Sequence, residues 1–197
     1  CTTRGQHNCC GNGICDATVE ACTDEPIPRR LWRLDHDQYE RTVMDLLGVS
    51  TDYGEHLAPD TAVDGYRNDA EALVISGLLA DQYRNAAEDL ASVADIAGML
   101  TCAPSDGQMS QCAATFIEDF GSRAFRRPIA PDEIETYLDL WAAIAEEDGF
   151  FEGLRWVVAG MLQSPHFLYR SELGTAAGDG AFTLTDWEIA SELSYLL

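Results

Sequence analysis

Residues 153–165, GLRWVVAGMLQSP, contain the apolar pattern that decides the predicted fold. Apolar side chains recur there at spacings of three and four residues, so a helix gathers them on one face. The members of this face are Leu154, Val157, Val158, Met161 and Leu162. Pro165 lacks a backbone N–H and breaks the helix. The segment therefore predicts a buried amphipathic helix.

The segments on either side follow the same pattern. Pro131 at a first-turn position opens a helix, with inward residues Ile134, Tyr137, Leu138, Trp141 and Ala145. A helix from about Ser110 to Phe125, which Pro128 ends, has inward residues Ala113, Phe116, Ile117, Phe120 and Ala124. After a Gly/Ala loop at 174–181, Thr185-Asp-Trp-Glu188 is a capping box that opens a last helix.

The N-terminal half also predicts helices. Asp35 and Gln38 form a capping box for a helix that Gly48 ends. A loop at 49–68 follows, and then a long helical stretch from about residue 69 to 100, broken near Ser76-Gly77.

Alternating strand patterns are scarce, and no hairpin signal is evident. The predicted fold class is therefore all-α, a multi-helix bundle preceded by a small Cys-rich disulfide head. We divide the chain into the head and linker (1–28), an N-terminal helical subdomain (29–100), a central helical subdomain (101–174) and the truncated start of a further helical domain (175–197).

Five of the seven cysteines crowd the first 22 residues, namely Cys1, Cys9, Cys10, Cys15 and Cys22. A zinc site needs Cys-x-x-Cys or nearby His ligands, which this spacing lacks, so disulfides are the favoured interpretation. Cys1 is the odd one, either a lipid-anchored mature N-terminus or one half of a truncated pair. No Cys-x-x-Cys-His run exists, which disfavours covalent haem in this segment.

The remaining cysteines, Cys102 and Cys112, flank a short polar loop. We predict a disulfide between them, because it would stabilise the chain by about 2–3 kcal/mol on the chain-entropy model. Two unrelated buried thiols are the alternative. Disulfides form in oxidising compartments, so we expect a secreted, periplasmic or cell-surface protein.

The formal net charge of −22 excludes several kinds of partner. All twelve basic residues are Arg. So acidic a chain repels phosphate backbones and anionic membrane surfaces, so nucleic acid is not an expected partner. Cations, basic proteins and neutral polymers stay open. No apolar run is long enough to predict a transmembrane segment.

Four arginines are concentrated in this acidic chain: Arg123, Arg126, Arg127 and Arg170. Guanidinium groups hold carboxylates in bidentate pairs, so ion pairs between helices are the first interpretation. A site for an anion or an acidic sugar is the second. His166, which lies between apolar residues, is expected in the core or at a helix cap. Aromatic side chains are core residues by default, since a sugar-binding platform would require them to be exposed.

Residues 60–71 resemble a calcium-binding loop in part. Asp60, Asp64, Asn68 and Glu71 stand at ligand positions, but Ala62 occupies the third position and Pro59 precedes the loop. A solvated loop that caps the next helix is the alternative. Calcium is thus the one cofactor that the sequence suggests. The head holds a weaker candidate in Asp16, Glu20 and Asp24.

Four segments in order resemble secreted planctomycete and myxobacterial cytochrome-like proteins, which are built of domains of unknown function. The segments are RLWRLDHDQYERTVMDLLG (30–48), FIEDFGSRAFRRP (116–128), GLRWVVAGMLQSPHFLYR (153–170) and LTDWEIASELSYLL (184–197). The resemblance covers most of residues 29–197. It implies further helical domains after the last segment, and some members carry a cytochrome c domain that this head does not match. The family offers no catalytic residues to transfer.

Three functions follow from these observations. The first is a non-catalytic binding or assembly module of a larger envelope protein, with the remainder of its own chain and periplasmic redox or envelope proteins as partners. The second is part of a periplasmic oxidoreductase or electron-transfer protein whose active site lies beyond Leu197. The third is a calcium-dependent surface or polymer-binding protein.

Overall fold

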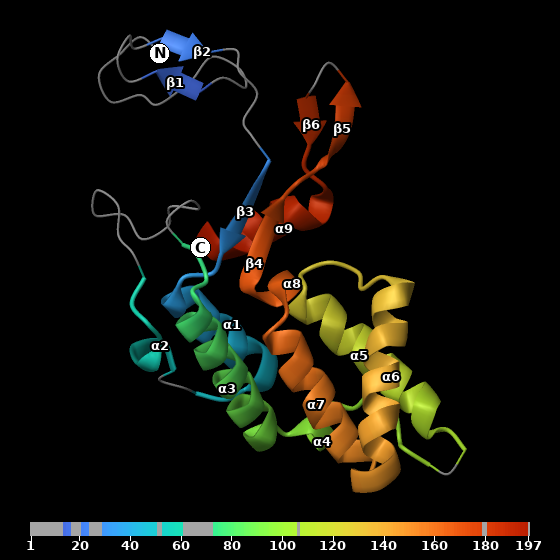
Figure 1. Ribbon diagram of the computed structural model, residues 1–197. Coiled ribbons are helices and arrows are strands. Elements are labelled where there is room, and N and C mark those ends of the chain that lie inside the picture. The colour runs from blue at the N-terminus through green and yellow to red at the C-terminus, as the bar shows by residue number, and fades with distance from the viewer. Residues whose placement is uncertain are drawn as a thin grey trace.

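The computed structural model describes residues 14–16, 21–23, 29–50, 53–60, 73–105, 107–178 and 181–196. Helices form one body, and short strands lie beside or above it (Figure 1). The helices are α1 (His36–Leu47), α2 (Tyr53–His56), α3 (Gly77–Val93), α4 (Ile96–Met99), α5 (Met109–Ala124), α6 (Pro131–Asp148), α7 (Phe150–Leu162), α8 (Pro165–Leu168) and α9 (Asp186–Leu196). The strands are β1 (Ile14–Asp16), β2 (Ala21–Thr23), β3 (Arg30–Arg33), β4 (Tyr169–Glu172), β5 (Thr175–Gly178) and β6 (Ala181–Thr183). The all-α prediction is confirmed in its main feature.

Helix α7 is the centre of the core, and it contacts α3, α5 and α6 (Figure 1). All residues of the predicted apolar face are fully buried: Leu154, Val157, Val158, Met161 and Leu162. Each such side chain contributes about 1.5–3 kcal/mol relative to an exposed one. Gly153 allows α6 to approach closely, because a Cβ atom there would lie 2.8 Å from the Trp141 carbonyl oxygen.

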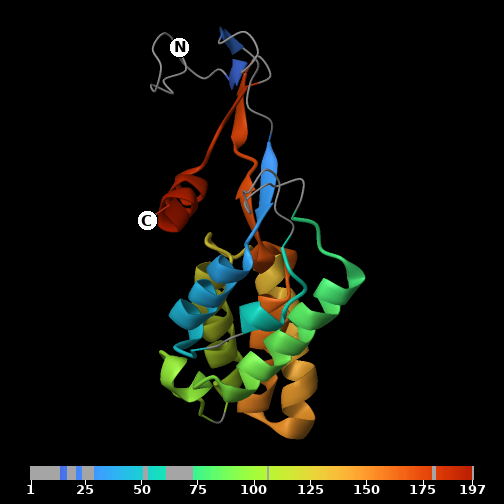
Figure 2. The same cartoon turned by 90° about the vertical axis from the view of Figure 1, so that its left-hand side faces the viewer.

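The antiparallel pair β3–β4 joins two segments that are far apart in the sequence. Arg30 pairs with Glu172 and Arg33 with Tyr169, and the Leu34 N–H continues the ladder by donating to the Leu168 carbonyl at 2.8 Å. Figure 2 shows this ribbon rising from the helical body, with α9 beside it. The pairing therefore places the residues before α1 directly against the residues after α8.

The structure corrects several local predictions. Ser76 is the N-cap of α3, at the predicted break, and a second break that the sequence did not indicate lies at Ala94–Asp95. The predicted loop at 49–68 contains the short helix α2. The Gly/Ala loop predicted at 174–181 forms most of the hairpin β5–β6. α2, β5 and β6 are too short for their side-chain period to show in the sequence.

The head is described only in β1 and β2, which pair with Cys15 opposite Cys22. Its predicted disulfides and its calcium candidates Glu20 and Asp24 lie outside the described residues. One core cluster contains residues from both 29–100 and 101–174, so the two predicted subdomains share their buried interior. The boundary between them stays a prediction.

Cys102 and Cys112 form the predicted disulfide. It joins the segment after α4 to the first turn of α5, and the Cys112 side chain is buried in the core. The bond therefore closes the loop between two helices that both contribute to the core.

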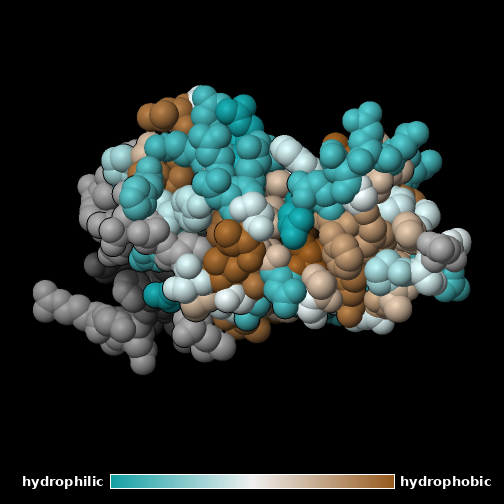
Figure 3. All heavy atoms as spheres, turned by 90° about the horizontal axis from the view of Figure 1, so that it is seen from below, coloured by the Kyte–Doolittle hydropathy of each residue, from teal (hydrophilic) through white to brown (hydrophobic). Residues whose placement is uncertain are grey.

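The surface of the helical body mixes polar and apolar residues. Figure 3 shows one face of it, where hydrophilic residues surround separate apolar patches. Such scattered apolar exposure is ordinary for a folded protein. In the described part of the chain, no helix combines the length and the apolar character needed to cross a membrane.

We predict that the double substitution Cys102→Ala and Cys112→Ala lowers the free energy of unfolding by about 2–3 kcal/mol, because the unfolded chain regains its loop entropy. Urea unfolding at neutral pH measures this loss. Wild type and double variant with equal unfolding free energies would contradict the prediction.

Candidate functional site

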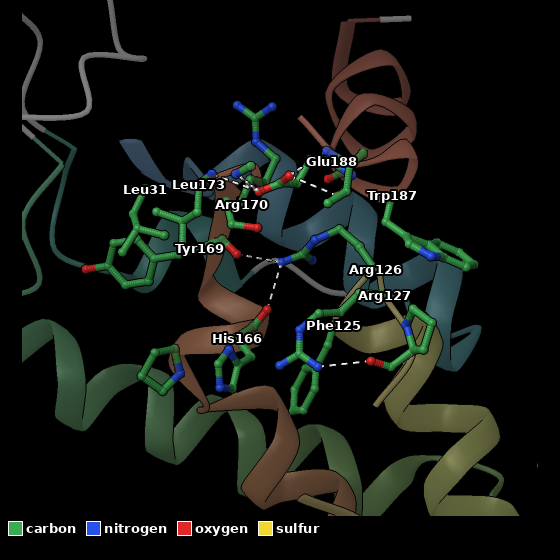
Figure 4. Close-up of a pocket in the computed structure, with 16 residues that line it drawn as sticks. Leu31, Phe125, Arg126, Arg127, His166, Tyr169, Arg170, Leu173, Trp187 and Glu188 are labelled. Atoms are coloured by element: carbon green, nitrogen blue, oxygen red, sulfur yellow. Dashed lines mark hydrogen bonds between the residues drawn. The ribbon is translucent and has the colours of Figure 1, made fainter. Parts of the chain in front are cut away.

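A pocket of about 620 Å³ opens between the helical body, the β3–β4 ribbon and α9 (Figure 4). Its walls come from the end of α5, from α8, from β4 and from the first turn of α9. This volume falls in the usual range for small-molecule sites, about 300–1,000 Å³. Three of the four predicted arginines line it: Arg126, Arg127 and Arg170.

Helix α5 ends in a Schellman turn with Arg126 at the position that glycine usually occupies. The Arg127 N–H donates to the Ser122 carbonyl at 3.2 Å, and the Arg126 N–H donates to the Arg123 carbonyl at 3.3 Å. Arg126 has φ 56°, and it is the only non-glycine residue with positive φ in the described part of the chain. A left-handed residue with a side chain costs about 1–2 kcal/mol, so the Arg126 side chain must offset that cost.

The Arg126 guanidinium holds the turn between α8 and β4. Its Nη2 donates to the carbonyls of His166 at 3.1 Å, Phe167 at 2.6 Å and Tyr169 at 3.0 Å. Its Nη1 donates to the Tyr195 hydroxyl of α9 at 3.3 Å. Among the described residues, no carboxylate lies within ion-pair distance of Arg126, and burial lowers its pKa. Arg126 is therefore a partly buried cation whose charge, among the described residues, is compensated only by neutral dipoles.

Arg127 forms a bidentate pair with Glu133 of α6. The two N–O distances are 2.7 and 2.8 Å, and Glu133 also accepts from the Ala130 N–H at 2.8 Å. His166 Nε2 lies 3.3 Å from the same carboxylate. Hydrogen bonding from Arg127 is the main cause that lowers the pKa of Glu133 to about 2. This carboxylate is thus ionised and fully engaged.

The two carboxylates on α9 near the pocket also accept hydrogen bonds, although burial raises the pKa of Glu192 and its Oε1 has no partner among the described residues. Arg170 donates to Glu192 at 2.8 Å and lies over the Tyr195 ring at 4.8 Å. Glu188 accepts from the N–H groups of Leu173, Gly174 and Thr185 at 2.8 to 3.0 Å. Burial opposes ionisation of Glu188, but these hydrogen bonds lower its pKa overall. The Thr185–Glu188 capping box is confirmed, and it also fixes the loop at Gly174.

The remaining wall of the pocket is apolar. Its members are Leu31, Phe125, Pro128, Pro165, Leu173 and Trp187. Trp187 lies at the rim with 55% of its surface exposed. Exposure is what an aromatic binding platform requires. In Figure 4, Arg126 lies between Trp187 and Tyr169 and points toward the His166 and Tyr169 carbonyls.

The other predicted site residues lie elsewhere. Arg123 belongs to a separate, more polar hollow, where its guanidinium lies 5.9 Å from the Phe120 ring. His166 is not a core residue, since 57% of its side chain is exposed at the pocket rim. It caps no buried carbonyl and faces Glu133 instead.

Asp60 is the one calcium candidate of its loop that is described, and its carboxylate pairs with the buried Arg33. It also accepts from the His36 backbone N–H at 3.2 Å. A calcium ion would have to displace Arg33 from this carboxylate. Asp64, Asn68 and Glu71 lie outside the described residues, so the calcium site stays a prediction. No group of three or more metal-binding side chains occurs in the described part of the chain.

Sequence reasoning missed Glu188 and Trp187, which line the pocket. It also missed Glu133 and Tyr195, which bind the pocket residues Arg127 and Arg126. The available signal for Glu133 was its place three residues after Ala130 at a helix start, where a carboxylate caps the backbone. Nothing in the sequence showed that the pocket existed, because three separate segments form it.

Two family models match the chain. Residues 32–96 match PSD3, a protein of unknown function (DUF1587), and residues 112–172 match PSD5, a protein of unknown function (DUF1595). The matches support the resemblance in one respect, namely that the chain contains two domains of unknown function. They lie within the predicted segments 29–100 and 101–174. No curated protein and no solved structure matches this chain.

We predict that Arg126→Ala lowers the free energy of unfolding by about 2–3 kcal/mol, because three carbonyls and Tyr195 lose a charged donor. Arg126→Gly should cost about 1 kcal/mol less, since glycine adopts the left-handed turn without strain. Thermal and urea unfolding of both variants measure the difference. An Arg126→Ala protein with unchanged melting would show that the side chain is not structural.

We predict that Glu133→Gln lowers stability by about 1 kcal/mol at neutral pH, a value reduced by the partial exposure of the pair. Because the folded pKa of Glu133 is depressed from 4.5 to about 2, its contribution is complete above pH 4.5 and disappears as pH falls toward 2. Unfolding free energies of wild type and variant should therefore converge at acid pH. Glu135→Gln, on the exposed face of α6, is the control, and a gap that persists at low pH would contradict the assignment.

Proposed function

We propose that the chain is a non-catalytic binding module whose binding site is the pocket between α5, α8, β4 and α9. One observation supports this most directly: Arg126 is a partly buried cation for which the described residues provide no carboxylate partner, and it lines an open pocket with an apolar wall. Buried charges in proteins are usually paired. A pocket that leaves one unpaired is typical of a site completed by a ligand.

The polar groups of the pocket favour binding over catalysis. Glu133 and Glu188 are engaged as hydrogen-bond acceptors for Arg127 and for backbone N–H groups, so they serve poorly as general bases. Among the described residues, the Ser191 hydroxyl has no hydrogen-bond partner and therefore no base bonded to it that would activate it as a nucleophile. The groups described here hold the pocket in shape and do not form a nucleophile–base pair around Ser191.

The wider setting of the module follows from the sequence. The Cys102–Cys112 disulfide favours an oxidising compartment, so we place the protein outside the reducing cytosol, in the periplasm or at the cell surface. The resemblance to cytochrome-like proteins suggests envelope or redox proteins as partners of the full-length protein. A calcium-dependent role is supported less well, because Arg33 occupies the carboxylate of Asp60.

A fragment panel tests the binding function. Ser171 lines the pocket on β4, and a strand accommodates an aromatic residue well, so Ser171→Trp should fill the pocket without unfolding the chain. We predict that neutral, cationic or anionic fragments shift the Trp187 indole and Gly174 amide signals in NMR spectra of the wild type, and that Ser171→Trp removes these shifts.

Gln111→Trp is the matched control, because Gln111 lies on the exposed face of α5 at the end far from Arg126. It should leave the fragment-induced shifts unchanged. If no fragment of any charge gives shifts that Ser171→Trp removes, the pocket is not a binding site and the proposal is wrong.

A further inference from the structure

We infer that the pocket selects a small monocarboxylate with a flat apolar body, its carboxylate against Arg126 and its body against Trp187. This inference rests on the proposed function and specifies the ligand class. The inference is argued from the positive charge of Arg126 on one wall of the pocket and from the apolar side chains on the other.

One arginine of the pocket has no carboxylate partner among the described residues, and that arginine is the candidate contact for an anion. Arg127 and Arg170 each have a carboxylate partner, at 2.7 and 2.8 Å, whereas the described residues provide none for Arg126. Glu188, the carboxylate that lines the pocket, is engaged by three backbone N–H groups. The guanidinium of Arg126 has five N–H bonds, and three of them remain once Nη2 serves the carbonyls of the α8–β4 turn. One of the Nη1 bonds serves Tyr195, so the Nε–H and the second Nη1–H remain as donors, each able to give a carboxylate one hydrogen bond.

The apolar wall of the pocket indicates that the rest of the ligand, apart from its carboxylate, is flat and apolar. Leu31, Phe125, Pro128, Pro165 and Leu173 offer carbon surface and no side-chain donors. Trp187 is more than half exposed and presents its ring at the rim. Flat apolar groups stack on such a ring. A sugar, which needs hydrogen bonds to several hydroxyls, finds few free donors or acceptors on these residues.

The net charge of the whole chain favours an anion with a single charge over a polyanion. At a net charge of −22, a polyanion meets long-range repulsion along its length, whereas a single carboxylate meets mainly the local field of Arg126. An acidic polysaccharide is therefore disfavoured, although its carboxylates resemble the preferred group.

Titration of the 197-residue wild type with 2-naphthoate and with 2-naphthamide tests the charge requirement, since the two probes share one ring system. We expect naphthoate to bind about tenfold more tightly, because a charge-assisted hydrogen bond replaces a neutral one. Naphthoate should shift the Arg126 Nε–H and Trp187 indole signals, and naphthamide only the indole. D-glucuronate should bind at least tenfold more weakly than naphthoate, because it lacks the apolar body.

Variants locate the two contacts. Arg126→Gln should weaken naphthoate binding about tenfold more than it weakens naphthamide binding, whereas Arg123→Gln, on the same helix but outside the pocket, should change neither. Trp187→Ala removes an exposed side chain, so the fold should persist while both probes bind more weakly. The wild-type comparison needs no variant and decides the inference even if Arg126→Gln fails to fold.

Three results would overturn the inference: equal affinities for the two naphthyl probes, shifts at Arg127 or Arg170 in place of Arg126, or glucuronate binding as tightly as naphthoate. Naphthyl binding without charge preference would leave the proposed binding function intact. The fragment panel tests that function separately, because it includes neutral and cationic compounds.

Discussion

The left-handed turn at Arg126 is the constraint on which the arrangement around the pocket depends. Its backbone ends α5, and its side chain donates to three carbonyls of the α8–β4 turn and to Tyr195 of α9. Tyr195 in turn lies 2.9 Å from the Thr42 hydroxyl on α1. One residue therefore connects the helical body to both the ribbon and the last helix. The strain of its backbone is consistent with a place where function and structure share a residue.

Two kinds of interaction stabilise different parts of this chain. Apolar stripes join α3, α5, α6 and α7 in the helical body. Arginines hold the segments that are not helical: Arg33 binds Asp60 and the Leu73 carbonyl, Arg30 binds Glu172, and Arg170 binds Glu192. A chain this acidic offers each arginine many carboxylates, so a partly buried arginine such as Arg126, with none among the described residues, is unusual here.

The sequence predicted the helical body because long amphipathic segments have a clear period. The faces of α5 and α7, the caps at Asp35 and Thr185, and the Cys102–Cys112 bond all agree with the structure. The strands were missed for the opposite reason. β3 and β4 have four residues each, and their pairing spans the whole domain, so neither period nor turn chemistry signals it.

The candidate site is formed partly by helices that the sequence predicted and partly by strands that it did not. The arginines stood out in the sequence by charge alone, yet their different roles depend on the turn after α5 and on strand pairing that no local pattern showed. Arg127 was predictable as an ion pair because Glu133 starts the next helix. Arg126 was not, because arginine at a left-handed position contradicts the local preference for glycine. Residues that break a local rule tend to mark functional or strained positions, and Arg126 is such a residue at the edge of an open pocket.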